Sequence, residues 1–127
     1  MQINKIIILS LTILLLASCS GEDKEIKLTR NICLFHNGDD INDSGYHLTQ
    51  KVGGNYYNEI VDHDIIDVYY DSHKIFVRSI VFKGDTDFYK IILKDDTLMS
   101  PVVLNLSAHL FIKDIKECTS CKKISLK

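Results

Sequence analysis

The chain has 127 residues, of which 46% are hydrophobic and 25% are charged, with 15 basic and 17 acidic side chains. That length suits one small domain around a single core. The formal net charge is −2, and the basic residues are not clustered, which argues against nucleic acid as a partner because binding to backbone phosphates needs a basic face.

The first residues are typical of a secretory signal peptide. Lys5 supplies the charge, and an apolar run follows over residues 6–16. That run is about 11 residues long, whereas a helix needs about 20 to cross a bilayer, so we do not expect a permanent transmembrane segment. We expect residues 1–18 to be a cleaved signal peptide.

The run ends in Leu16-Ala17-Ser18-Cys19, which resembles the lipobox of bacterial lipoproteins. The resemblance implies that a signal peptidase cuts between Ser18 and Cys19. It also implies that the Cys19 thiol receives a diacylglycerol and that the new amine is acylated, for example with palmitate. Several acyl chains on one residue anchor a protein stably. The alternative is an ordinary signal peptide that leaves Cys19 as a plain thiol.

The residues after Cys19 bear on the destination of the protein. Ser20 is similar to the residue at this position in lipoproteins that are sent to the outer membrane, and the acidic segment 22–25 resembles the export tags of some surface lipoproteins. The sequence therefore predicts a lipid-anchored protein of the cell envelope, at the outer membrane. Whether it faces the periplasm or the cell surface stays open.

Cleavage leaves 127 − 18 = 109 residues with 14 basic and 17 acidic side chains, because Lys5 departs, and hence a formal charge of −3. Residues 19–27 are charged or small, so we expect a lipidated flexible tether. We expect residues 28–127 to form a single small β-rich domain. The basic pair Lys122-Lys123 is expected to lie in a solvated tail.

Six segments rich in β-branched and aromatic residues, separated by turn formers, predict strands. They are residues 32–35, 46–50, 56–61, 65–70, 74–82 and 88–93. Short links fit antiparallel neighbours, because parallel strands need long crossovers. The predicted fold class is α+β and mainly β: a small antiparallel β-meander with a C-terminal helix.

The signals conflict over residues 101–115. Ser100-Pro101 is typical of an N-cap followed by the first helical residue, which favours a helix. Apolar and polar residues nevertheless alternate from Val102 to Lys113, as they do in a strand. We predict the helix and keep the strand as the alternative.

The succession of segments over residues 45–115 is similar to small bacterial lipoproteins that have a meander and a C-terminal segment led by proline. The likeness rests on Gly45-Tyr46-x-Leu48, Ile60-Val61, Val68-Tyr69-Tyr70-Asp71, Ile75-Phe76-Val77 and Phe88-Tyr89-x-Ile91-Ile92. These lipoproteins have no assigned activity, so the resemblance implies the architecture alone.

Three cysteines remain besides Cys19, in a compartment that permits disulfides, so one thiol is left over. Cys33 bonded to Cys118 or Cys121 would close a loop of some 85 residues, worth about 4–5 kcal/mol. The alternative is a local bridge between Cys118 and Cys121. Redox C-x-x-C motifs begin a helix after a strand, and zinc needs two further ligands, so we predict a structural disulfide.

One loop has the spacing of calcium ligands. Asp40, Asn42 and Ser44 provide oxygens at positions 1, 3 and 5, and Gly45 follows at position 6. Position 12 is Lys51, where a bidentate glutamate is required. We therefore prefer a solvated loop of turn formers and keep Asp40, Asn42 and Ser44 as a candidate calcium site.

Other chemistry-bearing residues form no recognised motif, and we predict neither catalysis nor a cofactor. The segment Asp62-His63-Asp64 could contribute to a metal site, but we expect scattered histidines because nothing in the sequence brings ligands together. Its candidate partners are His36, His47, His73 and His109. Six tyrosines lie in or beside predicted strands, and we expect most to be half-buried and a minority to form a contact surface. They are Tyr46, Tyr56, Tyr57, Tyr69, Tyr70 and Tyr89.

Two functions remain. The first is a membrane-anchored, non-catalytic module that binds a protein partner in the envelope, in the manner of an inhibitor or immunity protein. The second is a small metal-binding or hydrolytic envelope module.

Overall fold

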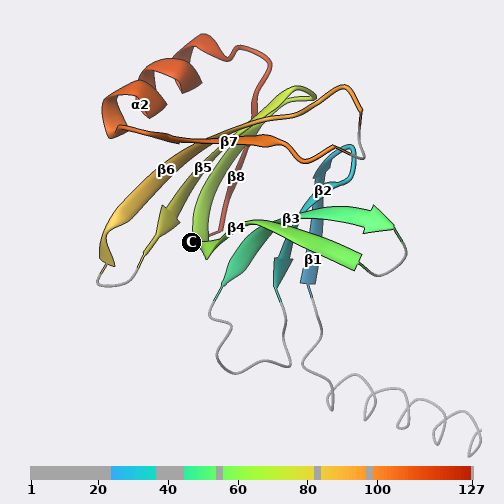
Figure 1. The fold of residues 1–127 in the computed structure, drawn as a ribbon. Coiled ribbons are helices and arrows are strands. Elements are labelled where there is room, and N and C mark those ends of the chain that lie inside the picture. Colours follow the sequence, from blue (N-terminus) through green and yellow to red (C-terminus); the bar gives the residue numbers. More distant parts are fainter. Residues whose placement is uncertain (1–23, 37–44, 54–55, 82–83, 97–98, 127) are drawn as a thin grey trace, which may run out of the picture.

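The structure is a computed structural model, and it describes residues 24–36, 45–53, 56–81, 84–96 and 99–126. These residues form one antiparallel sheet of eight strands and one helix (Figure 1). The elements are β1 (Lys24–Thr29), β2 (Ile32–His36), β3 (Tyr46–Gly53), β4 (Tyr56–Tyr70), β5 (Lys74–Ile80), β6 (Thr86–Ile92), β7 (Val102–Leu106), α2 (Ala108–Glu117) and β8 (Lys122–Ser125). β1 to β7 lie side by side in the order of the sequence, which confirms the predicted meander and its C-terminal helix.

The 15-residue strand β4 joins the two halves of the sheet. Its first part, to Ile65, pairs with β3, and its last part, from Asp64, pairs with β5. β8 also pairs with the last part, so it occupies the edge of β4 that β3 leaves uncovered. We predicted two strands here, separated by Asp62-His63-Asp64, and this was wrong. β3 pairs with Val61 and Ile65 on either side of the polar triplet, which lies at a register shift, and the pairing with β5 begins at Asp64.

The main hydrophobic core lies on one face of both halves. It consists of buried residues from β2 to β6: Ile32, Leu34, Leu48, Val61, Ile65, Val68, Ile75, Val77 and Ile91. The far ends of the halves are also joined across this core. Arg30, in the turn after β1, donates to the carbonyl of Lys94, and Gln50 Nε2 donates to the carbonyl of Met99 at 3.1 Å. The sheet therefore curls around its core.

Helix α2 covers the other face of the β5–β6 half. Phe111 is the buried residue of the helix, and it packs against Phe76, Phe88 and Tyr69. The two hydrophobic clusters thus lie on opposite faces of the same strands. This follows from the alternation of side chains along a strand, by which Ile75 and Val77 point one way and Phe76 the other.

Residues 101–115 contain both of the structures that we considered, a strand followed by a helix. The alternation holds in β7 as far as Leu106, and the helix begins at Ala108. Ser107 separates them, because its Oγ accepts a hydrogen bond from Leu110 N at 3.2 Å and so caps the helix. The predicted cap at Ser100-Pro101 was therefore wrong, and Pro101 precedes a strand.

Each end of the described chain contributes a strand that we did not predict. β1 begins at Lys24, within the expected tether, because its residues pair with β2 along Lys24–Lys27. At the other end, Lys122 and Lys123 belong to β8 and pair with Tyr70 and Tyr69 of β4, so they are not a solvated tail. Charged side chains on one side of an edge strand can stay in solvent while its backbone completes the sheet.

Candidate functional site

The outer edge of β7 is open among the described residues, where β7 pairs with β6 alone. Val103 and Leu104 lie in the middle of this strand, and their exposed fractions are 42% and 41%. Because they are successive, their side chains stand on opposite faces of the sheet. An approaching chain would therefore meet backbone donors and acceptors with an apolar side chain on either side.

The opposite edge of the sheet is built differently. β1 carries Lys24, Glu25 and Lys27, and its register with β2 shifts between Lys27 and Thr29. Charged residues and bulges are common devices that prevent another strand from pairing with an edge. β7 has the sequence Val-Val-Leu-Asn-Leu, with no charge, and its register with β6 is regular. β8, which in the described chain pairs with β4 alone, is four residues long and carries Lys122 and Lys123. Of these three edge strands, β7 is the one suited to accept a further strand.

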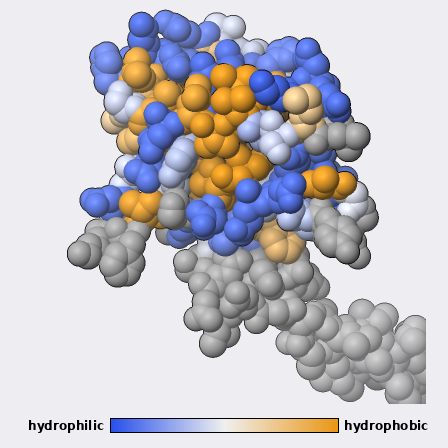
Figure 2. All heavy atoms as spheres, in the orientation of Figure 1, coloured by the Kyte–Doolittle hydropathy of each residue, from blue (hydrophilic) through white to orange (hydrophobic). Residues whose placement is uncertain are grey.

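Exposed apolar residues also lie around β7. Ile92 lies opposite Val102 on β6, Met99 precedes β7, and α2 exposes Leu110 and Ile112. Figure 2 shows hydrophobic residues gathered in a band at the centre of the face that β7 crosses in Figure 1. Contiguous apolar surface of this kind commonly marks a protein interaction site. We use the name β7 edge for the unpaired side of β7 together with the exposed side chains of Val103 and Leu104.

The tyrosines do not form this surface. All five whose side chains are described are half-buried: Tyr46, Tyr57, Tyr69, Tyr70 and Tyr89. This agrees with the expectation of cross-strand packing, and the side chain of Tyr56 lies outside the described residues. The exposed surface at β7 is formed by aliphatic residues and not by the tyrosines that we expected. The successive apolar residues Val102-Val103-Leu104 were a sequence signal for this surface, but residues 101–115 were predicted to be a helix.

The cysteines adopt the local pairing. Cys118 and Cys121 form a disulfide with their Cα atoms 5.5 Å apart, whereas Cys33 is a buried thiol. The Cys33 Sγ lies 3.2 Å from Thr49 Oγ1. Burial raises the pKa of the Cys33 thiol, and its hydrogen bond with Thr49 opposes that rise only in part. Cys33 is therefore held as an inert neutral thiol, and no bridge joins the two ends of the domain.

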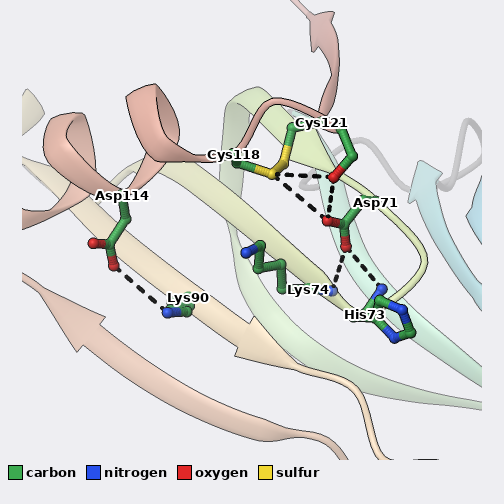
Figure 3. The surroundings of a disulfide bond; sticks show 8 residues. Asp71, His73, Lys74, Lys90, Asp114, Cys118 and Cys121 are labelled. Carbon is green, nitrogen blue, oxygen red and sulfur yellow. Dashed lines mark hydrogen bonds and ion pairs between the residues drawn. A yellow bond between two sulfur atoms is a disulfide. The ribbon is translucent and has the colours of Figure 1, made fainter.

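Asp71 lies beside the disulfide, in the turn between β4 and β5 (Figure 3). Its Oδ1 accepts hydrogen bonds from the backbone nitrogens of His73 and Lys74, at 2.8 and 2.9 Å. Its Oδ2 accepts one from Ser120 Oγ at 2.9 Å and lies 3.6 Å from Cys118 Sγ. Desolvation raises the pKa of Asp71, but the hydrogen bonds from His73, Ser120 and Lys74 together outweigh it and lower that pKa. Asp71 therefore remains a carboxylate with a fixed orientation.

Sequence analysis missed this group because Asp71 is 47 residues from Cys118. Ligand atoms of Asp71, Cys118 and Cys121 all lie within 4.8 Å of one another, and in the described part of the chain no other three metal-ligand residues come together in this way. The sequence signal for this group was the C-x-x-C spacing, which indicates Cys118 and Cys121 but not Asp71.

The other candidate metal ligands are not brought together. Asp62, His63 and Asp64 lie in β4, and the side chain of His63 is outside the described residues. His47 Nδ1 bonds to Glu59 Oε1 at 2.9 Å, and the ring of His36 packs against Tyr46. His36 and His47 thus serve separate local contacts.

Several predicted sites lie outside the described residues. These are the cleavage site at Ser18, the lipidation site at Cys19, and the candidate calcium ligands Asp40, Asn42 and Ser44. Gly45, the next residue, is buried, and an added Cβ there would lie 1.5 Å from Asp64 Oδ1. Gly45 is therefore required for the close approach of Asp64.

Comparisons with protein-family models, with curated proteins and with solved structures find no match for this chain. The one helix in the described part of the chain, α2, is too short and too polar to cross a membrane.

Proposed function

We propose that this chain is a lipid-anchored protein of the cell envelope whose domain binds another protein by accepting one of its strands at the β7 edge. The observation that carries the proposal is the contrast between β1 and β7, the strands at the two ends of the β1–β7 order. β1 is charged and bulged, whereas β7 is uncharged and regular and exposes Val103 and Leu104. Addition of a strand supplies affinity through main-chain hydrogen bonds and specificity through side chains on both faces.

The β7 edge defines the chemistry of the partner. Val103 continues the face of Ile91, and Leu104 continues the face of Lys90, which α2 covers. A strand placed opposite them would bury apolar side chains on both of its faces. We therefore propose that the partner supplies an extended, uncharged segment with successive apolar residues, rather than the alternating pattern of a half-exposed strand.

The position of β7 fits a domain held at a membrane by its N-terminus. In Figure 1, β1 begins at one end of the molecule, while β7 and α2 lie towards the other. A lipid on Cys19, five residues before Lys24, would hold the β1 end near the membrane and present the β7 edge away from it. Such an arrangement suits an inhibitor or immunity protein that blocks an incoming protein, a role proposed here by analogy.

Photo-cross-linking in cells that make the full chain tests this proposal. A photoreactive amino acid is placed at Leu104 or, as a matched control, at Val52, which is also in a strand and has an exposed fraction of 40%. Val52 lies near the end of β3, which is three strands away from β6 and four from β7 in the order of the sheet. We expect a discrete adduct with one envelope protein from position 104 and none from position 52.

A charge on the β7 edge then distinguishes strand addition from chance proximity. Val103→Lys should abolish the adduct from position 104, because a lysine would be buried against the incoming strand, while circular dichroism should show an unchanged fold. Equal adducts from both positions, or an adduct that survives Val103→Lys, would contradict the proposal.

A further inference from the structure

We propose that the chain, once its disulfide is reduced, binds one zinc ion through Cys118, Cys121 and Asp71. This site is separate from the β7 edge and does not depend on the function proposed for that edge. The sulfur atoms of Cys118 and Cys121 then either form the disulfide or bind the metal ion, but not both at once.

The geometry supplies three of the four ligands that zinc requires. A C-x-x-C pair is a common half of a zinc site, and the Cα separation of 5.5 Å already holds the two side chains together. Asp71 contributes the third ligand from the β4–β5 turn. Its Oδ1 is occupied by the backbone nitrogens of His73 and Lys74, which leaves Oδ2 directed at the sulfurs (Figure 3). Water would complete the tetrahedron.

Hydrogen bonds to the carboxylate serve as an outer shell for the site. Ligands held by further hydrogen bonds lose less freedom when the ion binds, and such partners commonly affect metal affinity about 10–100-fold. The hydrogen bond from Ser120 Oγ to Oδ2 is the one contact that the ion would displace or share.

The electrostatic field around the sulfurs favours a cation. Cys118 is the C-cap of α2, where the helix dipole carries partial negative charge, and Asp71 adds a full negative charge beside it. Lys74 provides one positive charge that opposes Asp71 in part.

The chemistry balances in two steps. A phosphine reductant gives two electrons to the disulfide and leaves as its oxide, with the oxygen taken from water, and two thiols are formed. Zinc then replaces the two thiol protons, which pass to the solvent. Exchange with a small-molecule disulfide, which takes up the two electrons and two protons from the solvent and leaves as two thiols, would form the Cys118–Cys121 disulfide again and release the ion.

Metal titration of the purified full chain tests the site. We expect the reduced chain to bind one Zn²⁺, and to give with Co²⁺ the near-ultraviolet absorption of thiolate-to-cobalt charge transfer. The oxidised chain should do neither. Asp71→Asn should weaken Zn²⁺ binding at least about 10-fold while the cobalt–thiolate band remains, because both sulfurs still bind.

Two substitutions serve as controls. Asp114→Asn removes a carboxylate of α2 that pairs with Lys90 and lies outside the cluster, and Cys33→Ala removes the remaining buried thiol. Neither should change the affinity for Zn²⁺. The proposal is overturned if the reduced chain binds no stoichiometric Zn²⁺, if the oxidised chain binds it equally, or if Asp114→Asn weakens binding as much as Asp71→Asn does.

Discussion

The ring of Phe111 in α2 lies against the ring of Phe88 in β6, with their centroids 4.8 Å apart. The edges of Phe76 and Tyr69 complete the contact from the neighbouring strands, each with a centroid 6.2 Å away. This aromatic cluster attaches the helix to the sheet. It therefore also determines the position of the chain on both sides of α2: β7 before it and the disulfide after it.

Phe111→Ala should lower the free energy of unfolding by about 3–5 kcal/mol, because it leaves a cavity among three aromatic rings. Ile112→Ala is the matched control, since Ile112 is the next residue of the helix and is exposed. Its effect should stay within about 0.5 kcal/mol. Urea denaturation of both variants measures the difference, and equal losses would mean that α2 does not pack through Phe111.

Gly45→Ala should destabilise the domain by about 1–3 kcal/mol, because the added methyl group would occupy the position of the Asp64 carboxylate. The loss should be smaller when Asp64→Ala is also present, since that change removes the group that the methyl meets. A double-mutant cycle followed by thermal denaturation measures this coupling. Strictly additive losses would show that Gly45 and Asp64 are not in contact.

The meander could be predicted because its signals are local. Runs such as residues 74–80 carry β-branched and aromatic side chains, and turn formers separate them from their neighbours. For the disulfide, the sequence left two alternatives open: a bridge between Cys118 and Cys121, or a bridge from Cys33 to one of them. The choice between them depends on where Cys33 lies in the fold, and Cys33 is a buried free thiol on β2.

The parts that could not be predicted depend on contacts between distant segments. The sequence favoured Ser100 as the N-cap, whereas Ser107 caps the helix because residues 102–106 pair with β6 first. That pairing also leaves Val103 and Leu104 exposed. Asp71 reaches the disulfide because β8 returns to β4, which places the loop between α2 and β8 beside the β4–β5 turn. Hydrophobic periodicity predicts individual strands, but it does not predict that β8 pairs with the distant strand β4.

Asp71→Asn should destabilise the domain by about 1–2 kcal/mol at neutral pH, because the charge that accepts three hydrogen bonds is lost. The folded pKa of Asp71 lies below its ordinary value of 3.8. Its contribution is therefore present above pH 3.8 and is lost as the pH falls through the lower, folded value. Urea denaturation at about pH 7 and about pH 2 should show the difference between wild type and variant shrinking in acid. An unchanged difference would assign the loss to packing.

Thiol titration of the chain purified from cells tests the lipid anchor and the disulfide together. Of the four cysteines, two form the disulfide and Cys19 is expected to carry lipid, so 4 − 2 − 1 = 1 thiol remains. A disulfide reagent should find no reactive thiol in the native chain, since Cys33 is buried, and one after unfolding without reductant. Two thiols after unfolding would mean an unmodified Cys19 with the disulfide intact. Three would mean a modified Cys19 with Cys118 and Cys121 reduced, and four would mean that neither modification is present.

Hydrogen exchange of the full chain with its cross-linked partner, measured by mass spectrometry, tests strand addition at the β7 edge most directly. Pairing with a new strand protects amides that were open to solvent. We expect slower exchange within Val102–Leu106 in the complex and unchanged exchange within Lys24–Thr29, the opposite edge of the same sheet. Protection of β1, or a complex that forms without any protection of β7, would contradict the account.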